Sequence, residues 1–198
     1  MNRLRTAAAA LATIGIILGL SACSSDDKPS TTPRSTKAAT TTPATTGAPD
    51  WEAAYSPAEL EAYSEALARY TAYQAKVKPI WAAGKATPTA EALFKEYFIP
   101  WQYYFGQLEQ YEASGIRLNF EMNVLDSKAT RIKLGADGGS VSIRQCVDST
   151  KSSGTQNDKP LPKATTTPQL LDVVVEQAGG RWLIAEISNS TEDRPCDG

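Results

Sequence analysis

The nine residues IRLNFEMNV, from Ile116 to Val124, decide the fold because apolar and polar side chains alternate strictly along them. A period of two predicts a β-strand with one buried and one solvated face. Residues 51 to 115, which precede this stretch, follow helical spacing instead, and most of the residues after it follow strand spacing. The stretch therefore marks the change from a helical half to a strand half.

The first predicted helix begins at a capping box. Ser56 supplies the N-cap, Pro57 the first helical position, and Glu59 the reciprocal acidic residue. Apolar residues then recur at spacings of three and four, which predicts one buried stripe. We expect this helix to end near Lys78, because Pro79 cannot donate the next backbone hydrogen bond.

Two shorter helical segments should complete the helical half. Thr87-Pro88 begins the first of them, and Pro100 should kink or break it. A further helical segment is predicted from Trp101 to Glu112, and Gly115 can supply a left-handed C-cap.

The strand half is defined by alternation and by turn residues. Turns are predicted at 126–128 and 137–139, and residues 149–168 contain so little apolar material that we expect a long exposed loop. The nearly continuous apolar run at 170–175 predicts a strand covered on both faces. Further strands are predicted at 116–124, 130–134, 141–145 and 181–187. This order predicts an α+β domain, with N-terminal helices packed on one face of a curved, mainly antiparallel sheet of about five strands.

Several short motifs in this half resemble a known family. They are the stretch Cys146-Val147-Asp148-Ser149 and the residues GRWLI at 180–184, followed by Cys196. With the order of elements, they resemble secreted actinobacterial lipoproteins that have a nuclear transport factor two-like (cystatin-like, SnoaL-like) cone fold. The resemblance covers residues 51–198 and implies a sheet that curves around a cavity.

The N-terminus carries a second resemblance. Leu20-Ser21-Ala22-Cys23 ends an apolar run of 14 residues that begins at Ala7, with Arg3 and Arg5 before it. The run has the length of a secretory signal and is shorter than the roughly 20 apolar residues of a spanning helix, so a short transmembrane anchor is the alternative interpretation. The motif resembles the lipobox of bacterial lipoprotein precursors. The resemblance implies cleavage before Cys23, a diacylglyceryl group on its sulfur, and anchoring at the extracytoplasmic face of the cell membrane.

A tether, residues 23–50, separates this signal segment (1–22) from the predicted domain (51–198). From Ser24 to Pro49, 20 of 26 residues are Ser, Thr, Pro or Ala, and none is aromatic or a large aliphatic. Such a composition cannot bury enough apolar surface to offset the entropy of ordering. The sequence therefore predicts a disordered spacer.

Composition limits the chemistry that the chain can perform. The chain has 20 basic and 22 acidic residues and contains no histidine. This mildly acidic balance gives no electrostatic basis for binding nucleic acid. The absence of histidine removes the serine–histidine and cysteine–histidine nucleophile systems and most transition-metal sites. We therefore expect neither a cofactor nor a metal.

Two cysteines remain when Cys23 is assigned to lipid. Cys146 and Cys196 form an even set in an oxidising compartment, which predicts a structural disulfide. Closing a loop of about 50 residues would stabilise the fold by roughly 4 kcal/mol on the chain-entropy model. The alternative is a redox pair, but such pairs usually lie close in sequence as C-x-x-C.

Aromatic residues gather in the helical half, where 14 of the 16 lie between Trp51 and Tyr111. One interpretation is that the rings pack between the helices and the sheet. The other is an aromatic pocket around Phe98, Trp101, Tyr104 and Phe105, in which the first three would bind a ligand. Residues 103 to 105 point about 100° apart on a helix and cannot all face one core. We therefore expect Trp101 or Tyr104 to line a cavity or an interface.

These features favour a non-enzymatic, membrane-tethered domain that binds an apolar or glycan-like ligand or an envelope protein. A prophage-encoded lipoprotein that interferes with superinfection has the same architecture and is a second hypothesis. A third is a cavity enzyme of the isomerase or cyclase type, for which the cone-fold resemblance implies an acidic base in the cavity. Glu121, Asp148 and Glu176 are the candidates, although a solvated strand face is the simpler interpretation of each.

Overall fold

The computed structural model describes residues 49–136, 138–163 and 165–190, and Cys196. Within this part the chain is an α+β domain of three α-helices and two antiparallel sheets, so the predicted fold class is confirmed. Cys23, the predicted signal segment and residues 23–48 of the predicted tether lie outside the described residues.

The helices begin where their capping residues stand. The helical elements are η1 (Glu52–Ala54, a 3-10 helix), α1 (Pro57–Ala83), α2 (Pro88–Tyr97) and α3 (Trp101–Ala113). At the start of α1 the Ser56 hydroxyl accepts from the Glu59 N–H, and the Glu59 carboxylate accepts from the Ser56 N–H. At the start of α2 the Thr87 hydroxyl accepts from the Ala90 N–H. Both predicted helix starts are confirmed.

The first helix is longer than predicted. Pro79 lies inside α1, where it removes one backbone hydrogen bond at a cost of about 3 kcal/mol. The helix continues past Lys78 because Trp81 is buried against three rings from later segments. Removing such a buried ring typically costs about 3–5 kcal/mol, so its packing offsets the proline. Gly84, with φ +59°, then supplies the left-handed C-cap.

The predicted break at Pro100 and the predicted C-cap glycine are both confirmed. Tyr97 is the last residue of α2 and Trp101 the first of α3, and the Ile99–Pro100 peptide bond between them is cis. Gly115, with φ +66°, follows α3 and ends the helical half.

In the part of the chain that the structure describes, seven strands in two sheets replace the predicted single sheet of about five strands. The strands are β1 (Ile116–Asn119), β2 (Asn123–Gly135), β3 (Gly138–Asp148), β4 (Ser153–Gln156), β5 (Lys159–Pro160), β6 (Gln169–Ala178) and β7 (Arg181–Asn189). One sheet has the order β1-β4-β5 and the other the order β2-β3-β6-β7, and all pairings between these strands are antiparallel.

The stretch 116–124 forms two strands rather than the one predicted. β1 ends at Asn119 and pairs with β4, whereas β2 begins at Asn123 and pairs with β3. The chain therefore passes from one sheet to the other within a stretch whose side-chain alternation is unbroken. Alternation reports which face a side chain takes, but it does not report which strand lies beside it.

The predicted turn at 126–128 is wrong, because β2 continues through it. The register with β3 shifts between Val124 and Asp126, which gives the strand a bulge at this point. The Ser127 hydroxyl lies in hydrogen-bond contact with the Tyr63 hydroxyl at 3.2 Å and accepts from Nε2 of Gln145 at 3.3 Å. Through these contacts Ser127 stabilises residues 126–128 as part of a strand, although polar residues of this kind are common in turns. The predicted turn at 137–139 does separate β2 from β3, which pair as far as Gly135 and Gly138.

Residues 149–168 are mostly exposed, as the sequence predicts, but they are not the long loop expected, since they include the β4–β5 hairpin. Asn157 and Asp158 have φ values of +49° and +64°, as the two central residues of a type I′ turn require. β4 pairs with β1 through backbone hydrogen bonds, for which apolar side chains are not needed. Low apolar content was therefore a misleading signal here.

The apolar run at 170–175 forms β6 as predicted, but only one of its faces is fully buried. Val173 and Val175 have no exposed surface, whereas Leu170, Asp172 and Val174 are half-buried on the opposite side. We call the side of the four-stranded sheet that packs on the helices the inner face, and the opposite side the outer face. The prediction that both faces of this strand are covered is wrong because the described α-helices pack on the inner face.

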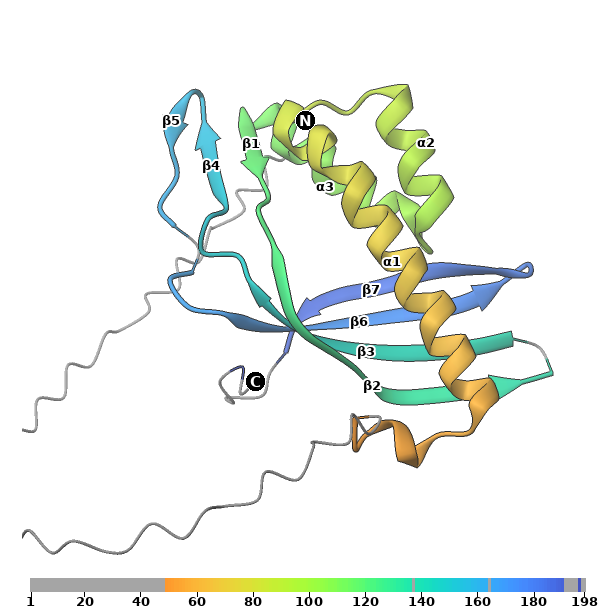
Figure 1. Ribbon diagram of the computed structural model, residues 1–198. Coiled ribbons are helices and arrows are strands. Elements are labelled where there is room, and N and C mark those ends of the chain that lie inside the picture. Colours follow the sequence, from red (N-terminus) through yellow and green to blue (C-terminus); the bar gives the residue numbers. More distant parts are fainter. Residues whose placement is uncertain (1–48, 137, 164, 191–195, 197–198) are drawn as a thin grey trace, which may run out of the picture. The chain divides into compact units, whose positions relative to one another are not determined.

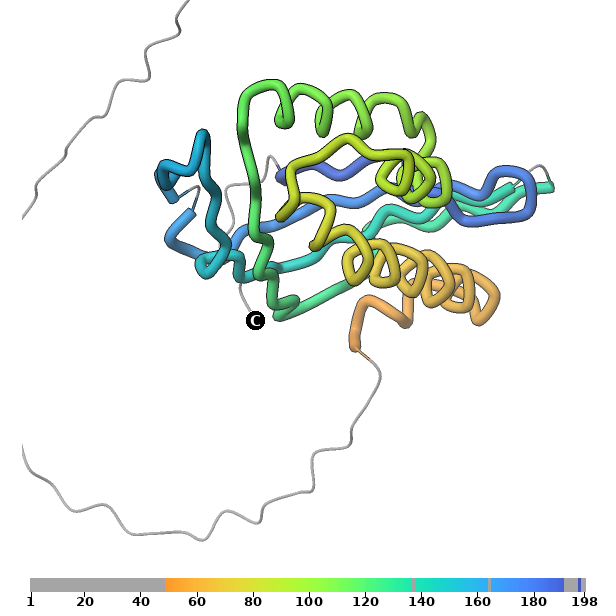
Figure 2. The backbone as a smooth tube through the Cα atoms, turned by 90° about the horizontal axis from the view of Figure 1, so that it is seen from above, coloured from red at the N-terminus to blue at the C-terminus, as the bar shows by residue number. Residues whose placement is uncertain are grey.

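The helices form one layer over the inner face. α1 crosses the four-stranded sheet and contacts β2, β3, β6 and β7 (Figure 1). Seen from above, α2 lies between α1 and α3 (Figure 2). The core lies between these helices and inner-face residues such as Val141, Ile143 and Ile184, which are completely buried.

The predicted disulfide between Cys146 and Cys196 is confirmed, with 5.4 Å between the two Cα atoms. Cys146 lies on the outer face, because its neighbour Gln145 points inward to Ser127. The bond therefore fastens the chain beyond β7 to the outer side of β3.

Candidate functional site: a cavity between the helices and the sheet

A cavity of about 390 Å³ opens between the helical layer and one end of the four-stranded sheet. Its walls come from α1 and α3, from the β1–β2 link, from the segments that flank β4 and β5, and from the ends of β6 and β7. Cavities of a few hundred Å³ that are open at one side are the usual size of small-molecule sites.

The deep wall of the cavity is aromatic and comes from one stripe of α1. Tyr70, Tyr73, Val77 and Trp81 recur at spacings of three and four, so they lie on one face of the helix. All four are buried, with 7 % or less of their surface exposed. Phe120 packs edge-on to Trp81 at 6.1 Å between ring centroids, and it extends this wall across the β1–β2 link.

The mouth of the cavity is polar but uncharged. Gln169 and Asn189 are exposed at the ends of β6 and β7, and Ser149, Ser152 and Thr165 are half-buried beside them. None of the described residues that line the cavity is Asp, Glu, Lys or Arg. The cavity therefore has an apolar interior, a rim of amides and hydroxyls, and no fixed charge in the lining described.

Burial keeps the tyrosine hydroxyls of the cavity neutral. It raises the pKa of Tyr70 and of Tyr73 far above the ordinary value, and it raises the pKa of Tyr104 as well. The Ile187 N–H, which donates to the Tyr104 oxygen, opposes part of that rise. These hydroxyls are thus hydrogen-bonding groups rather than bases at physiological pH.

Gln74 places an amide in the aromatic wall. Its side chain offsets part of the rise in the pKa of Tyr70, yet its buried Nε2 atom makes no hydrogen bond of good geometry within the described part of the chain. A buried donor without an acceptor costs about 1–3 kcal/mol. Bound water or a ligand that supplies an acceptor would remove this cost.

Tyr104 is the one predicted ligand-binding residue that lines the cavity. Its hydroxyl also reaches the free edge of β7, where it accepts from the Ile187 N–H at 3.2 Å and donates to the Ala185 carbonyl at 3.4 Å. Ala185 is the extra residue of a bulge in β7, between the residues that pair with Val174 and Val175. Tyr104 therefore both lines the cavity and satisfies the backbone at an irregular strand edge.

Phe98 and Trp101, the other two predicted ligand-binding residues, do not line the cavity. Phe98 is 2 % exposed and packs among Tyr73, Phe94 and Tyr104 in the core. Trp101 is half-buried at the start of α3, with the Lys95 ammonium 4.6 Å from its ring centroid. Of the three predicted residues, Tyr104 alone is in the lining of the cavity with the α1 aromatic residues, although its ring also packs on Phe98.

The aromatic residues of α1 were missed as site residues because a stripe at helical spacing is usually packing. One signal was present, since Gln74 interrupts an otherwise apolar stripe. A polar residue at a core position has to find either a partner or a cavity.

The three candidate carboxylates lie outside this cavity. Glu121 and Asp148 come together, with Lys78 and Lys151, around a separate charged hollow of about 330 Å³. Hydrogen bonds from the Thr150 side chain and backbone hold the pKa of Asp148 below its ordinary value, which disfavours it as a proton acceptor. Glu176 lies elsewhere, near the β2–β3 hairpin.

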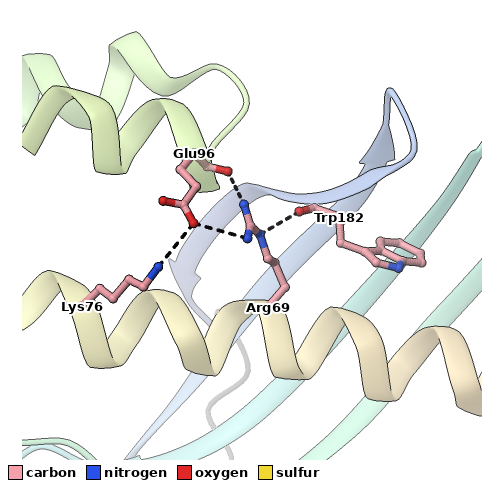
Figure 3. Close-up of polar contacts among 4 residues, drawn as sticks. All are labelled: Arg69, Lys76, Glu96 and Trp182. Atoms are coloured by element: carbon pink, nitrogen blue, oxygen red, sulfur yellow. Dashed lines mark hydrogen bonds and ion pairs between the residues drawn. The ribbon is translucent and has the colours of Figure 1, made fainter.

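A second polar cluster, around Arg69, is structural. The Arg69 guanidinium donates to the Trp182 carbonyl at 3.1 Å and to the Glu96 carbonyl, and its Nη1 lies 3.7 Å from the Glu96 carboxylate (Figure 3). It also lies over the ring of Tyr97, 3.9 Å from the centroid. Lys76 pairs with the same Glu96 carboxylate. Arg69 of α1 thereby joins α2 to β7, and each of its three guanidinium nitrogens contacts Glu96 or Trp182.

The fold and cavity define an α+β protein with an uncharged pocket under its helical layer. No family model matches the sequence, and no curated protein is detectably similar to it. Among solved structures, the intermembrane-space region of the chloroplast protein ARC6 aligns with 59 % of this chain and 90 % of that one, at 13 % identity and a TM-score of 0.41. A likeness of this size supports no functional inference.

Two further observations concern metals and membranes. Within the residues that the structure describes, no cluster of Cys, Asp and Glu is arranged to hold a metal ion. The helices of this same part are either too short or too polar to cross a bilayer.

Proposed function

We propose that this protein is a lipid-anchored domain of the cell envelope that binds an uncharged, partly apolar small molecule in the cavity beneath its helices. The lipobox-like sequence ending at Cys23 supports the anchor and the extracytoplasmic location. The resemblance to the nuclear transport factor two-like proteins supports a cavity built from helices and a curved sheet.

One observation carries the binding proposal: the cavity of about 390 Å³ has a deep aromatic wall, a rim of amides and hydroxyls, and no charged residue in the described lining. A charged ligand would leave its charge uncompensated in such a site, which is costly. A neutral ligand with an apolar body and one or two acceptor groups matches both the aromatic wall and the polar rim. Its acceptor would meet Nε2 of Gln74, which makes no hydrogen bond of good geometry within the described residues.

The test is the binding of a matched pair of fluorescent probes to the full processed chain. The probes are neutral N-phenyl-1-naphthylamine and its anionic sulfonate, 8-anilinonaphthalene-1-sulfonate. We expect the neutral probe to bind with enhanced emission and the anionic probe to bind at least tenfold more weakly, because only the second brings a charge into the cavity. Equal binding of the two probes would contradict an uncharged cavity.

A pair of substitutions separates the cavity from the surface. Leu171 lines the cavity, whereas its neighbour Leu170 points to the outer face of the same strand. Leu171→Trp should fill the cavity and abolish probe binding, and Leu170→Trp should leave it unchanged. Circular dichroism of both variants establishes that they remain folded. If Leu171→Trp binds the neutral probe as the wild type does, the cavity is not the binding site.

The same pair of variants can identify the natural ligand. Native mass spectrometry after incubation with neutral envelope lipids and neutral oligosaccharides distinguishes the apolar from the glycan ligand. A bound molecule that adds its mass to Leu170→Trp but not to Leu171→Trp is a ligand of the cavity.

A further inference from the structure

The outer face of the four-stranded sheet carries an ordered distribution of charge. Strand pairing places one residue of each strand in each row across the sheet, and a row begins on β2 and ends on β7. In one row Lys128 and Arg144 stand on β2 and β3, and Asp172 and Ser188 stand on β6 and β7. The basic half of this row is therefore on one side of the sheet and the acidic half on the other.

The next two rows repeat this order. Arg131 begins the second row and Glu186 ends it, with the small residues Ser142 and Val174 between them. The third row begins at Lys133 and reaches Glu176 on β6. All three rows run from positive on β2 to negative on β6 or β7, so the face is polarised across its strands.

The charges at the two edges are available to a partner. Lys128, Arg131, Lys133, Glu176 and Glu186 are exposed, and within the described part of the chain none of them forms an ion pair. At the centre, Nε of Arg144 donates to Asp172 at 2.7 Å and Nη2 donates to it at 3.2 Å, with both side chains half-buried.

We propose that the outer face is a self-complementary docking surface for a second copy of this chain. A two-fold axis parallel to the strands and midway between β3 and β6 would stack the two sheets face to face, with β2 of one copy over β7 of the other. Arg131 then faces Glu186 of the second copy, and the same contact repeats on the other side of the axis. An axis perpendicular to the strands would instead stack β2 on β2 and oppose like charges.

The same axis assembles the central charges. It places Arg144 of each copy over Asp172 of the other, so two intramolecular pairs become a square of alternating charges. Ser142 and Val174, which separate the charged edges of the middle row, are small enough for two sheets to approach to the usual spacing of about 10 Å. Geometry and charge therefore select one orientation.

The area of the outer face limits the affinity of the dimer. Four strands spaced about 4.8 Å apart are about 19 Å wide, and eight residues rising about 3.3 Å each give a length of about 26 Å. The two copies together would bury at most roughly 1,000 Å², which is at the low end for a specific interface. The disulfide of Cys146 with Cys196 occupies one end of this face and limits its length. The dimer is consequently weak and depends on the edge charges.

Charge reversal tests the proposal with the processed full chain in detergent, by sedimentation equilibrium over a concentration series. Because each dimer contains the Arg131–Glu186 contact twice, Arg131→Glu should weaken association roughly tenfold or more, and Glu186→Arg should do the same. Lys151→Glu is the matched control, since it makes the same charge reversal at an exposed turn that shares a hollow with Lys78 of α1, and it should leave association unchanged. Higher salt should weaken the wild-type dimer, because the edge charges are exposed.

Mixing the two reversed variants gives the decisive result. A copy with Arg131→Glu presents acid at both ends of the middle row and a copy with Glu186→Arg presents base at both ends, so the two should form a heterodimer although neither self-associates well. The double variant should recover the wild-type dimer. Failure of the mixture and of the double variant to associate would overturn the proposal, as would a wild-type chain that stays monomeric at the highest soluble concentration. A dimer that is insensitive to both reversals would place the contact on another surface and overturn the proposal equally.

Discussion

Tyr104 shows how one side chain can serve both the scaffold and the site. Its ring lines the cavity and packs on Phe98 at 4.0 Å between centroids, while its hydroxyl meets two backbone groups at the bulge in β7. The adjacent Tyr103 is 67 % exposed, and its ring meets the Tyr104 ring in a T-shaped contact at 5.1 Å between centroids. The two neighbours therefore form a natural comparison of the same residue type in two environments.

At this scale we predict that Tyr104→Phe lowers the free energy of unfolding by about 1–2 kcal/mol, because the Ala185 carbonyl and the Ile187 N–H lose their side-chain partner. The neutral probe should still bind, since the ring that lines the cavity is unchanged. Tyr103→Phe is the control and should stay within about 0.5 kcal/mol of the wild type. Urea denaturation gives the free energy of unfolding of the wild type and of both variants. Equal stability of the two variants would show that the hydroxyl of Tyr104 contributes nothing at the strand edge.

At the scale of elements, the strands depend on partners that are distant in sequence. β1 pairs with β4 across the whole of β2 and β3, as in the pairing of Ile116 with Gln156. The edge of β7 that faces away from β6 is covered by the α2–α3 link, where the Ile99 N–H donates to the Ile184 carbonyl at 2.9 Å. The disulfide adds a covalent tie from the end of the chain to β3.

The element-scale prediction concerns that tie. Cys196→Ser should lower the free energy of unfolding by up to about 4 kcal/mol, because the Cys146–Cys196 bond closes a loop with a sequence separation of 50. The measurement is chemical denaturation of the oxidised protein, with reduced wild type as the control. Reductant should lower the free energy of unfolding of the wild type to that of the variant, and it should leave the value for the variant unchanged. If oxidised wild type and variant unfold at the same denaturant concentration, the bond does not stabilise the domain.

At the scale of the whole molecule, the described domain and the N-terminal sequence address different questions. The domain supplies a cavity and a polarised sheet face. The sequence that ends at Cys23 bears on location, and it lies outside the described residues. Weak pairing through the outer face would be favoured on a membrane, because tethering raises the effective concentration of each copy.

We therefore predict that Cys23→Ala abolishes membrane anchoring. The variant should lose the mass of the lipid and should no longer enter the detergent-rich phase on Triton X-114 partition, because no other attachment to the bilayer is proposed. Ser24→Ala, the adjacent substitution, should leave both properties unchanged. A Cys23→Ala protein that stays in the membrane with unaltered processing would contradict the lipid anchor.

Some features of this protein were determined by sequence alone, because they depend on interactions within a few residues. The Ser56–Glu59 capping box, the start at Thr87 and the break at Pro100 are local, and the structure confirms them. The α+β class also follows from the change in apolar period at residue 116. The Cys146–Cys196 bond was predictable by counting, since only two cysteines remained.

The tertiary structure alone decided the rest, because those features depend on contacts between residues far apart in the chain. Pro79 stays within α1 because Trp81 finds its packing partners in later segments, and no local signal encodes that gain. The cavity is a property of the space between elements: Tyr70, Tyr104 and Leu171 each follow ordinary packing patterns, and only the fold brings them around one volume. The polarised outer face likewise exists only once the register sets Arg131 and Glu186 in one row, because sequence gives the face of a side chain but not its neighbour on the next strand.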